Sequence, residues 1–273
     1  EWAQDYRADR IAELIEATPQ HSPATIAAIQ LDQQDGHARA ELPGMQALDP
    51  KTEGARKVWD VLMDWDYESV RSSKADLPWM HYNKELVRYA LTDKLPAEGI
   101  EMYMWATVMG NSLPEVEGGL EHFVEDTDMA RRAALLEAWK VLEVQAGPSP
   151  SDWRWSDHHA LSFEHPFVAG GAPVSMNAGS AEVGGSVNTV NPGGYSWRRG
   201  TEVTWIASLR LVMPLANLPG SEAVLPPGQS GQPASSWYQD QLRFWKSGDL
   251  LPLWYADADV SANGAHELVL SKP

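Results

Sequence analysis

Three histidines and an aspartate near the middle of the chain have side chains that could bind a metal ion or relay a proton. Asp157, His158 and His159 are consecutive, and His165 follows a few residues later. Adjacent histidines do not easily reach the same ion, and the spacing from His158 to His165 fits no common zinc motif. We therefore interpret this group as structural and predict no metal site in it.

Ser230 and a pair of glutamates are further residues with the chemistry of an active site. Ser230 lies in the sequence Gly-Gln-Ser-Gly, where the second glycine comes one residue too early for the nucleophile elbow of a serine hydrolase. Glu115 and Glu117 are two positions apart in a predicted loop, where exposure to solvent accounts for their charges. We predict no catalytic role for any of the three.

The composition argues against several classes of function. The chain has no cysteine, which excludes disulfides, Cys-ligated metals and a thiol nucleophile. Its 38 acidic and 21 basic residues give a formal net charge of -17, and such a surface repels nucleic acid. No apolar run approaches the roughly 20 residues that cross a bilayer, and the polar start at Glu1 has no signal-peptide pattern. We therefore expect no nucleic-acid partner and no membrane association.

The elements that position these residues differ between the two halves of the chain. Before residue 148, apolar residues recur at helical spacing in three stripes: Ile11, Leu14 and Ile15; Val58, Val61, Leu62 and Trp65; Leu135, Trp139 and Leu142. The pattern predicts five to seven helices, with residues 69–94 mostly helical. Asp126 or Thr127 is the predicted N-cap of the last helix, and Gly147 and Pro148 are its predicted end.

Two prolines lie inside predicted helices of this half. Pro43, followed by Gly44, interrupts the helical pattern between His37 and Leu48, and Pro78 interrupts the one that begins near Ser69. A proline inside a helix removes a backbone hydrogen bond and clashes with the preceding turn. We therefore expect a break or kink near each proline.

The second half is rich in glycine and serine and has short segments with β propensity. We predict strands at residues 186–190, 201–212 and 267–270. In the middle segment, alternation predicts that one face is buried (Val203, Trp205, Ala207, Leu209 and Leu211) and that the other faces solvent (Thr204, Ser208 and Arg210). The tail, residues 226–255, is interpreted as an ordered coil with one short helix near residues 238–245.

Helices followed by strands predict an α+β fold class. We expect a helical N-terminal half, then a short, mainly antiparallel sheet and a wrapping C-terminal coil. The helical region is residues 1–148, and the strand-rich region with the tail is residues 149–273; the two are expected to form one compact unit. The strands are few, which fits a sheet that is completed by chain outside this sequence.

The tail also carries an ordered series of residues that resembles the end of the β chain in the penicillin acylase family: Pro227, Gly228, Gln229, Ser230 and Gly231, then Tyr238, Asp240, Gln241, Trp245, Pro252 and Leu253. His165 and Pro166, with residues 186–191, resemble a second region of the family. Residues 6–11, which contain Ala-Asp-Arg, are similar to a helix start in the family. The resemblance therefore spans essentially the whole chain.

The resemblance implies part of the αββα N-terminal-nucleophile hydrolase fold and a linear-amide hydrolase of the penicillin amidase type. In that family a serine exposed by self-cleavage attacks the amide, its own α-amino group takes the proton, and backbone and Asn donors stabilise the oxyanion. The resemblance places the nucleophile, that Asn, most of the acyl pocket and the calcium ligands outside this chain. Arg10 matches the arginine beside the family's active site; the other interpretation is a helix-terminal arginine in a salt bridge.

These considerations predict the C-terminal part of a β chain that is inactive alone and has no cofactor of its own. The implied partners are the remaining parts of a processed acylase and a small acyl-amide substrate, and the implied location is periplasmic or secreted. One alternative is a truncated or engineered non-catalytic fragment, with Pro43, Gly44, Asp76 and Pro78 as changes at surfaces that were formerly covered. Another is a ligand-binding module rich in tryptophan, which predicts exposed, coplanar indole rings among the 13 Trp.

Overall fold

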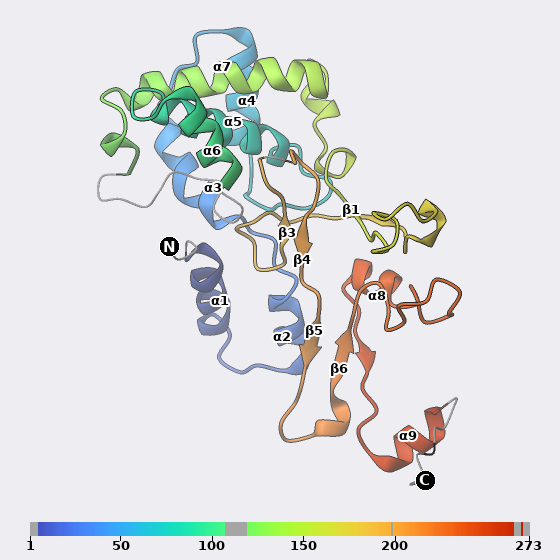
Figure 1. The fold of residues 1–273 in the computed structure, drawn as a ribbon. Coiled ribbons are helices and arrows are strands. Elements are labelled where there is room, and N and C mark those ends of the chain that lie inside the picture. Colours follow the sequence, from blue (N-terminus) through green and yellow to red (C-terminus); the bar gives the residue numbers. More distant parts are fainter. Residues whose placement is uncertain (1–4, 107–118, 198, 265–268, 270–273) are drawn as a thin grey trace.

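The structure, a computed structural model, describes residues 5–106, 119–197, 199–264 and 269. Figure 1 shows α3 to α7 gathered at one end of the molecule, while β5, β6 and α9 extend away from them toward the C-terminus. The α-helices are α1 (Tyr6–Glu16), α2 (Pro23–Ile29), α3 (Gly36–Glu41), α4 (Glu53–Met63), α5 (Asp76–Leu91), α6 (Ala97–Ala106), α7 (Thr127–Gln145), α8 (Leu242–Ser247) and α9 (Asp257–Asn263). The strands are β1 (Ala160–Ser162), β2 (Ser180–Glu182), β3 (Gly193–Gly194), β4 (Trp205–Ile206), β5 (Arg210–Val212), β6 (Glu222–Val224) and β7 (Leu251–Pro252).

The helical region forms as its apolar stripes and capping residues predict. Within α4, Val58 and Leu62 are fully buried, and α4, α5 and α7 pack against one another. The Asp126 carboxylate caps α7 by accepting a hydrogen bond from the backbone N–H of Met129 at 2.8 Å. Gly147 ends this segment with a φ of 97°, in the left-handed region that glycine adopts at least cost. The α1 stripe differs, because no described residue of α1 is buried.

The two prolines have different effects. At Pro43 the predicted break is confirmed, because α3 ends at Glu41 and a 3-10 turn (Leu42–Met45) follows. At Pro78 there is a break without a kink, because the helix begins just before this proline. This proline lies in the first turn of α5, where its missing N–H has no helical partner to lose. The segment 69–94, which the sequence predicts to be mostly helical, is therefore helical from Asp76 to Leu91, and residues 69–75 are not helical.

Asp76 and Pro78 are both buried within this chain. The interpretation of these two residues as changes at a formerly covered surface is therefore wrong. Both residues lie within the core of the helical region, where Leu77 and Trp79 are also buried.

The strand-rich region forms three small antiparallel sheets, with the orders β1-β2, β3-β4 and β5-β6-β7. In the third sheet Arg210 lies opposite Val224, and Glu222 lies opposite Pro252. The strand predicted at residues 186–190 is wrong, because this segment is a turn held by its own side chains. The backbone N–H of Ser186 donates to Thr189 Oγ1, and that of Asn188 donates to Ser186 Oγ, both at 3.0 Å.

The predicted strand at residues 201–212 is divided between two sheets, as β4 and β5. The predicted alternation fails between them: Arg210 is buried, whereas Leu209 is 52% exposed. The segment that separates β4 from β5 includes Ala207, whose carbonyl accepts from Trp245 Nε1 at 3.0 Å. The side-chain direction changes where the chain leaves one sheet and enters the next. The strand predicted at residues 267–270 lies outside the described residues, apart from Val269.

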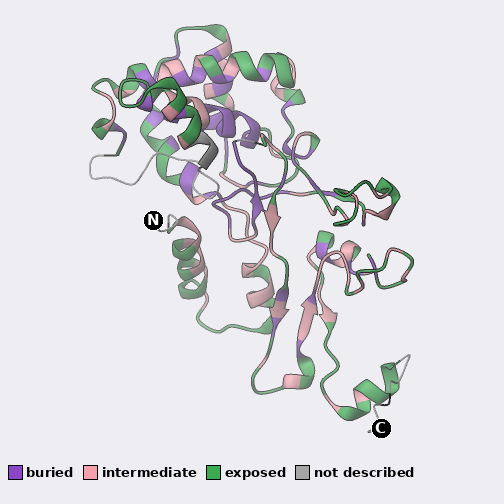
Figure 2. Ribbon diagram, viewed as in Figure 1, coloured by how far each residue is buried: buried purple, intermediate pink, exposed green. Residues whose placement is uncertain are grey.

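The main core extends beyond the helical region. Trp153, Trp155, Tyr195 and Trp197 from the second region are buried in the same cluster as the helices, and a smaller core contains Leu161, Val224 and Trp245. Figure 2 shows the buried residues concentrated around the helices and the loops below them, whereas α9 is mainly exposed. No helix within the described part of the chain has the length and apolar character that crossing a membrane requires.

Candidate functional site

Arg10 lies in α1, and its guanidinium is turned toward the segment that follows α2. Its Nε donates to both carboxylate oxygens of Asp32, at 3.1 and 3.2 Å, and its Nη2 donates to Oδ2 at 2.8 Å. Such two-point pairing fixes the plane of the guanidinium as well as its position. The side chains are only 16% and 12% exposed, so solvent screens the pair weakly.

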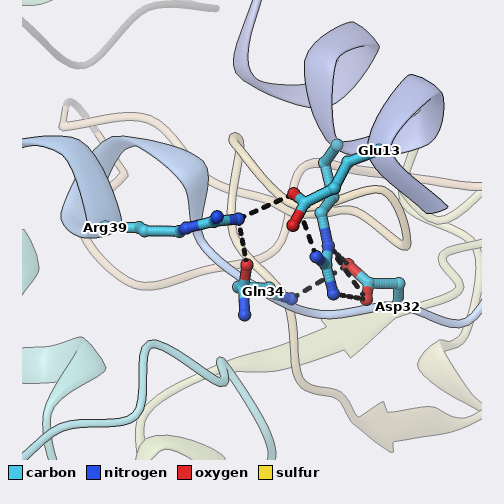
Figure 3. Close-up of polar contacts among 5 residues, drawn as sticks. Glu13, Asp32, Gln34 and Arg39 are labelled. Carbon is cyan, nitrogen blue, oxygen red and sulfur yellow. Dashed lines mark hydrogen bonds and ion pairs between the residues drawn. The ribbon is translucent and has the colours of Figure 1, made fainter. Parts of the chain in front are cut away.

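The pair belongs to a wider network that joins α1, the α2–α3 connection and α3 (Figure 3). Glu13 Oε2 forms salt bridges with Arg10 Nη1 at 3.1 Å and with Arg39 Nη1 at 2.7 Å. The Arg39 side chain also donates to Gln34 Oε1 at 2.8 Å, and the Gln34 backbone N–H donates to Asp32 Oδ1 at 3.3 Å. Arg10 is therefore held by carboxylates on two sides.

The network keeps its groups charged. The hydrogen bond from Arg10 to Asp32 is the main cause that raises the pKa of Arg10, so the guanidinium stays protonated. Hydrogen bonds from Arg39 and then Arg10 lower the pKa of Glu13. A fixed guanidinium can orient a neighbouring polar group or stabilise negative charge beside it. All three nitrogens of Arg10 point at carboxylates here, so the salt bridge that was the alternative interpretation is present.

The residues of the predicted Asp-His group do not converge on one point. His159 is fully buried and stacks on Trp155 with ring centroids 4.0 Å apart, while its Nδ1 lies 2.8 Å from the Thr201 carbonyl oxygen. Asp157 pairs with Arg154, and His165 Nε2 contacts the Gly231 carbonyl at 3.3 Å. Within the described ranges there is no group of three or more His, Cys, Asp or Glu residues that could hold a metal ion.

In the part of the chain that the structure describes, the surroundings of the other candidate residues do not indicate catalysis. Ser230 Oγ accepts a hydrogen bond from the backbone N–H of Gln232 at 3.1 Å, which is the contact of a polar turn. Glu115 and Glu117 lie outside the described residues. Arg10 therefore stays a predicted site residue, and its described contacts are those of a salt bridge.

Two buried carboxyl groups, those of Asp35 and Asp76, are not predicted by the sequence as candidate site residues. Asp35 caps α3 through the Ala38 N–H at 2.9 Å and accepts from Ser186 Oγ at 2.5 Å, so it joins segments far apart in the chain. Asp76 is 2% exposed, and its Oδ2 has no hydrogen-bond partner among the described residues. Burial raises the pKa of Asp35, and it raises that of Asp76 to about 8. An aspartate before a helix signals a cap, but nothing local signals burial of both groups.

Most of the tryptophans that the structure describes belong to cores. Fully or almost fully buried indoles are those of Trp65, Trp79, Trp153, Trp155, Trp197 and Trp245. Trp237 and Trp254 are more than half exposed and line an apolar groove, yet the described aromatic pairs do not include them stacked on each other. The coplanar exposed rings that a tryptophan-rich binding module predicts are therefore not found among these residues.

The described fold resembles that of a solved structure. A solved structure described as a thermostable penicillin G acylase from Alcaligenes faecalis superposes with a TM-score of 0.61, over 98% of this chain and 52% of that chain, at 16% identity. A sequence model of the family described as penicillin amidase matches residues 1–262. The chain belongs to the penicillin amidase family, which confirms the resemblance in its tail and helix start.

Curated relatives agree with this assignment. The penicillin acylase 2 proenzyme of Pseudomonas sp. strain SE83 is 28% identical over 97% of this chain and 35% of its own length. The acyl-homoserine lactone acylase QuiP of Pseudomonas syringae pv. syringae is 24% identical over 90% of this chain and 34% of its own. The chain thus spans about a third of the length of the curated relatives it matches.

Proposed function

We propose that this chain is the C-terminal part of an amide hydrolase of the penicillin acylase type, which acts through an acyl-enzyme whose nucleophile lies outside the chain. The family match over residues 1–262 carries this proposal. The relatives are named as acylases of penicillin and of acyl-homoserine lactones, so the substrate class is a small acyl amide. The contribution of this chain is scaffold, one edge of the sheet and Arg10.

An exposed apolar groove supports the proposal that this chain has a partner, namely the rest of such an acylase. The groove has a volume of about 1090 Å³ and lies between the β5-β6-β7 sheet, the tail and α9. Leu209, Trp237 and Trp254 line it and are each more than half exposed. Contiguous apolar surface of this kind marks an interaction site in soluble proteins, and β5 and β7 are edge strands of their sheet.

The remaining parts of the proposal concern location and metal. We propose a periplasmic or secreted location, on the strength of the family resemblance. We also propose that this chain binds no cofactor of its own and that any calcium is bound by residues outside it. The described residues give calcium no cluster of carboxylates.

The proposal predicts a difference in activity between this chain and the product of the complete gene. The complete product is expected to hydrolyse a chromogenic phenylacetyl amide or an acyl-homoserine lactone, because it supplies the nucleophile. The chain purified alone is expected to release no product above buffer in the same assays. Turnover by the isolated chain that persists after repeated purification, and that co-elutes with it, would contradict the proposal.

Arg10→Ala distinguishes a role in the active site from a purely structural one. In the complete gene product we expect it to lower kcat/KM about tenfold or more, since positioning contacts are of that size. It is also expected to lower the free energy of unfolding by about 2 kcal/mol, because the mostly buried Asp32 loses its partner. Arg39→Ala is the matched control: Arg39 shares Glu13 but is 47% exposed, so both effects should be small. If both variants lose kcat/KM equally while remaining folded at the assay temperature, Arg10 has only a structural role.

A further inference from the structure

A small cavity lies between the segment after α2, the loop after β2 and the end of α8. Its volume is about 190 Å³. Among its lining residues are three cations and one carboxylate: Arg71, Arg210, Lys246 and Glu182. The chain as a whole has a formal charge of -17, so this excess of positive charge is local and runs against the rest of the surface.

Arg210 forms the buried wall of the cavity. Its side chain starts on β5 and is 5% exposed. Nη1 donates to the Trp245 carbonyl at 2.8 Å, and Nη2 donates to Asn191 Oδ1 at 3.0 Å. Both partners are neutral groups, and Nε has no hydrogen-bond partner within the described part of the chain. The described carboxylates form no ion pair with this guanidinium.

A buried cation without a counterion is costly, and the side chain stays charged nonetheless. Burial lowers the pKa of Arg210 only to about 10, which leaves it protonated at neutral pH. The face of Trp245, with its ring centroid 4.9 Å from the guanidinium carbon, offsets part of the cost. A second, anionic partner would offset more, since charge-assisted hydrogen bonds are the strongest that a guanidinium makes.

We propose that this cavity binds a small oxyanion, a carboxylate or a phosphate, with Arg210 as its buried contact and Arg71 and Lys246 at its rim. The planar fork of a guanidinium matches two oxygens of either group. Two features of the cavity oppose the binding of an anion: the Glu182 carboxylate and the carbonyl groups at the C-terminal end of α8. Arg210 already binds the Trp245 carbonyl of that helix end, and the lining retains two more cations than carboxylates.

Two glycines in the walls of the cavity allow the segments around it to approach one another closely. A Cβ at Gly248 would lie 2.6 Å from Leu31 Cδ1, and one at Gly184 would lie 2.5 Å from the Ser69 carbonyl. Gly184 requires glycine because its contact is with backbone, and Gly248 requires it because its φ of 84° lies in the left-handed region. Leu31 and Gln33 line the cavity, whereas Asp32 between them pairs with Arg10. The oxyanion site and the Arg10 network thus share one segment but remain separate sites.

Titration calorimetry of the whole chain tests this site, with inorganic phosphate and acetate as probes and sodium chloride at matched ionic strength as the reference. We expect saturable binding of at least one probe. Arg71→Gln combined with Lys246→Gln should weaken it about tenfold or more, because two charges within reach of the ligand are lost. These residues are exposed, so the double variant is expected to fold. Arg210→Lys, which keeps the charge but not the fork, should weaken binding further.

Arg243→Gln is the matched control, because Arg243 is an exposed cation of α8 that does not line the cavity. It should leave the affinity unchanged. Binding of phosphate without acetate identifies a phosphate ligand, and the converse identifies a carboxylate. The proposal is overturned if neither probe binds beyond the chloride reference. It is also overturned if Arg243→Gln weakens binding as much as the double variant does, since the attraction would then be a general effect of surface charge.

Discussion

Asp76→Asn is expected to raise the free energy of unfolding relative to the wild type, by an amount that grows as the pH rises from about 4 to about 8. Asp76 is at the start of α5 with its carboxyl group buried, and Oδ2 has no hydrogen-bond partner among the described residues. Burial raises its pKa from 3.8 to about 8, and the nearby Asp35 carboxylate adds to the increase. The native state therefore holds this proton over a range in which the unfolded chain releases it.

The sign follows from that difference in proton binding. Below a pH of 3.8 both states are protonated and the contribution of Asp76 to stability is complete. As the pH rises, ionisation favours the unfolded state, with a slope of up to about 1.4 kcal/mol per pH unit for one proton. The loss ends where the pH passes the native pKa of about 8. Asparagine cannot ionise, and its amide offers a donor to the polar groups around it.

Urea unfolding at intervals of one pH unit measures this effect. The Asp76→Asn profile should lie increasingly above the wild-type profile toward pH 8. Burial lowers the pKa of His37, His81 and His159 to about 4, and their titration affects both profiles alike. A residual slope is expected from Asp35, because burial raises its pKa as well. Asp60→Asn, the same substitution at an exposed position on α4, should run parallel to the wild type. Parallel profiles for wild type and Asp76→Asn would mean that Asp76 is already ionised in the native state.

The helices could be predicted from the sequence because their determinants are local. The stripe through Val58 and Leu62 and the cap at Asp126 lie within one or two turns of the residues they organise. The strands could not be predicted in the same way, because a short strand is defined by the strand it pairs with, which is distant in the sequence. Arg210 was expected to face solvent from its place in an alternating pattern. It is buried because the chain passes from one small sheet into another between β4 and β5, and because Trp245 and Asn191 accept its hydrogen bonds.

The candidate site was predictable only in part, for a similar reason. The Ala-Asp-Arg resemblance pointed to Arg10, but its partner Asp32 is 22 positions away, with no sequence pattern to connect them. Likewise Asp35 and Ser186 meet across 151 positions. Family membership supplies the expected chemistry, whereas which groups are buried together depends on tertiary packing that local patterns do not encode.

Trp155→Ala is expected to destabilise the helical and the strand-rich regions together, by about 4 kcal/mol, as for large-to-small changes in a core. Trp155 is fully buried and belongs to the main core with the helices. Its ring stacks on His159 and meets Tyr195 edge-on with centroids 5.8 Å apart. Its Nε1 donates to the Gly185 carbonyl at 3.1 Å, so alanine leaves both a cavity and an unpaired carbonyl.

Two spectroscopic probes and two further variants test this claim. Far-UV circular dichroism follows the helices and near-UV dichroism follows the packed aromatic rings, and a shared core requires the two transitions to coincide and shift together.

Trp237→Ala is the same substitution at a 56% exposed position and should change stability by no more than about 0.5 kcal/mol. Trp155→Phe keeps the stacking but leaves the Gly185 carbonyl unpaired, so it should cost about 1 to 2 kcal/mol. If Trp155→Ala lowers only the aromatic transition and leaves the helical one in place, the regions on either side of residue 148 unfold independently. The buried tryptophans after Gly147 would then not join them into one cooperative unit.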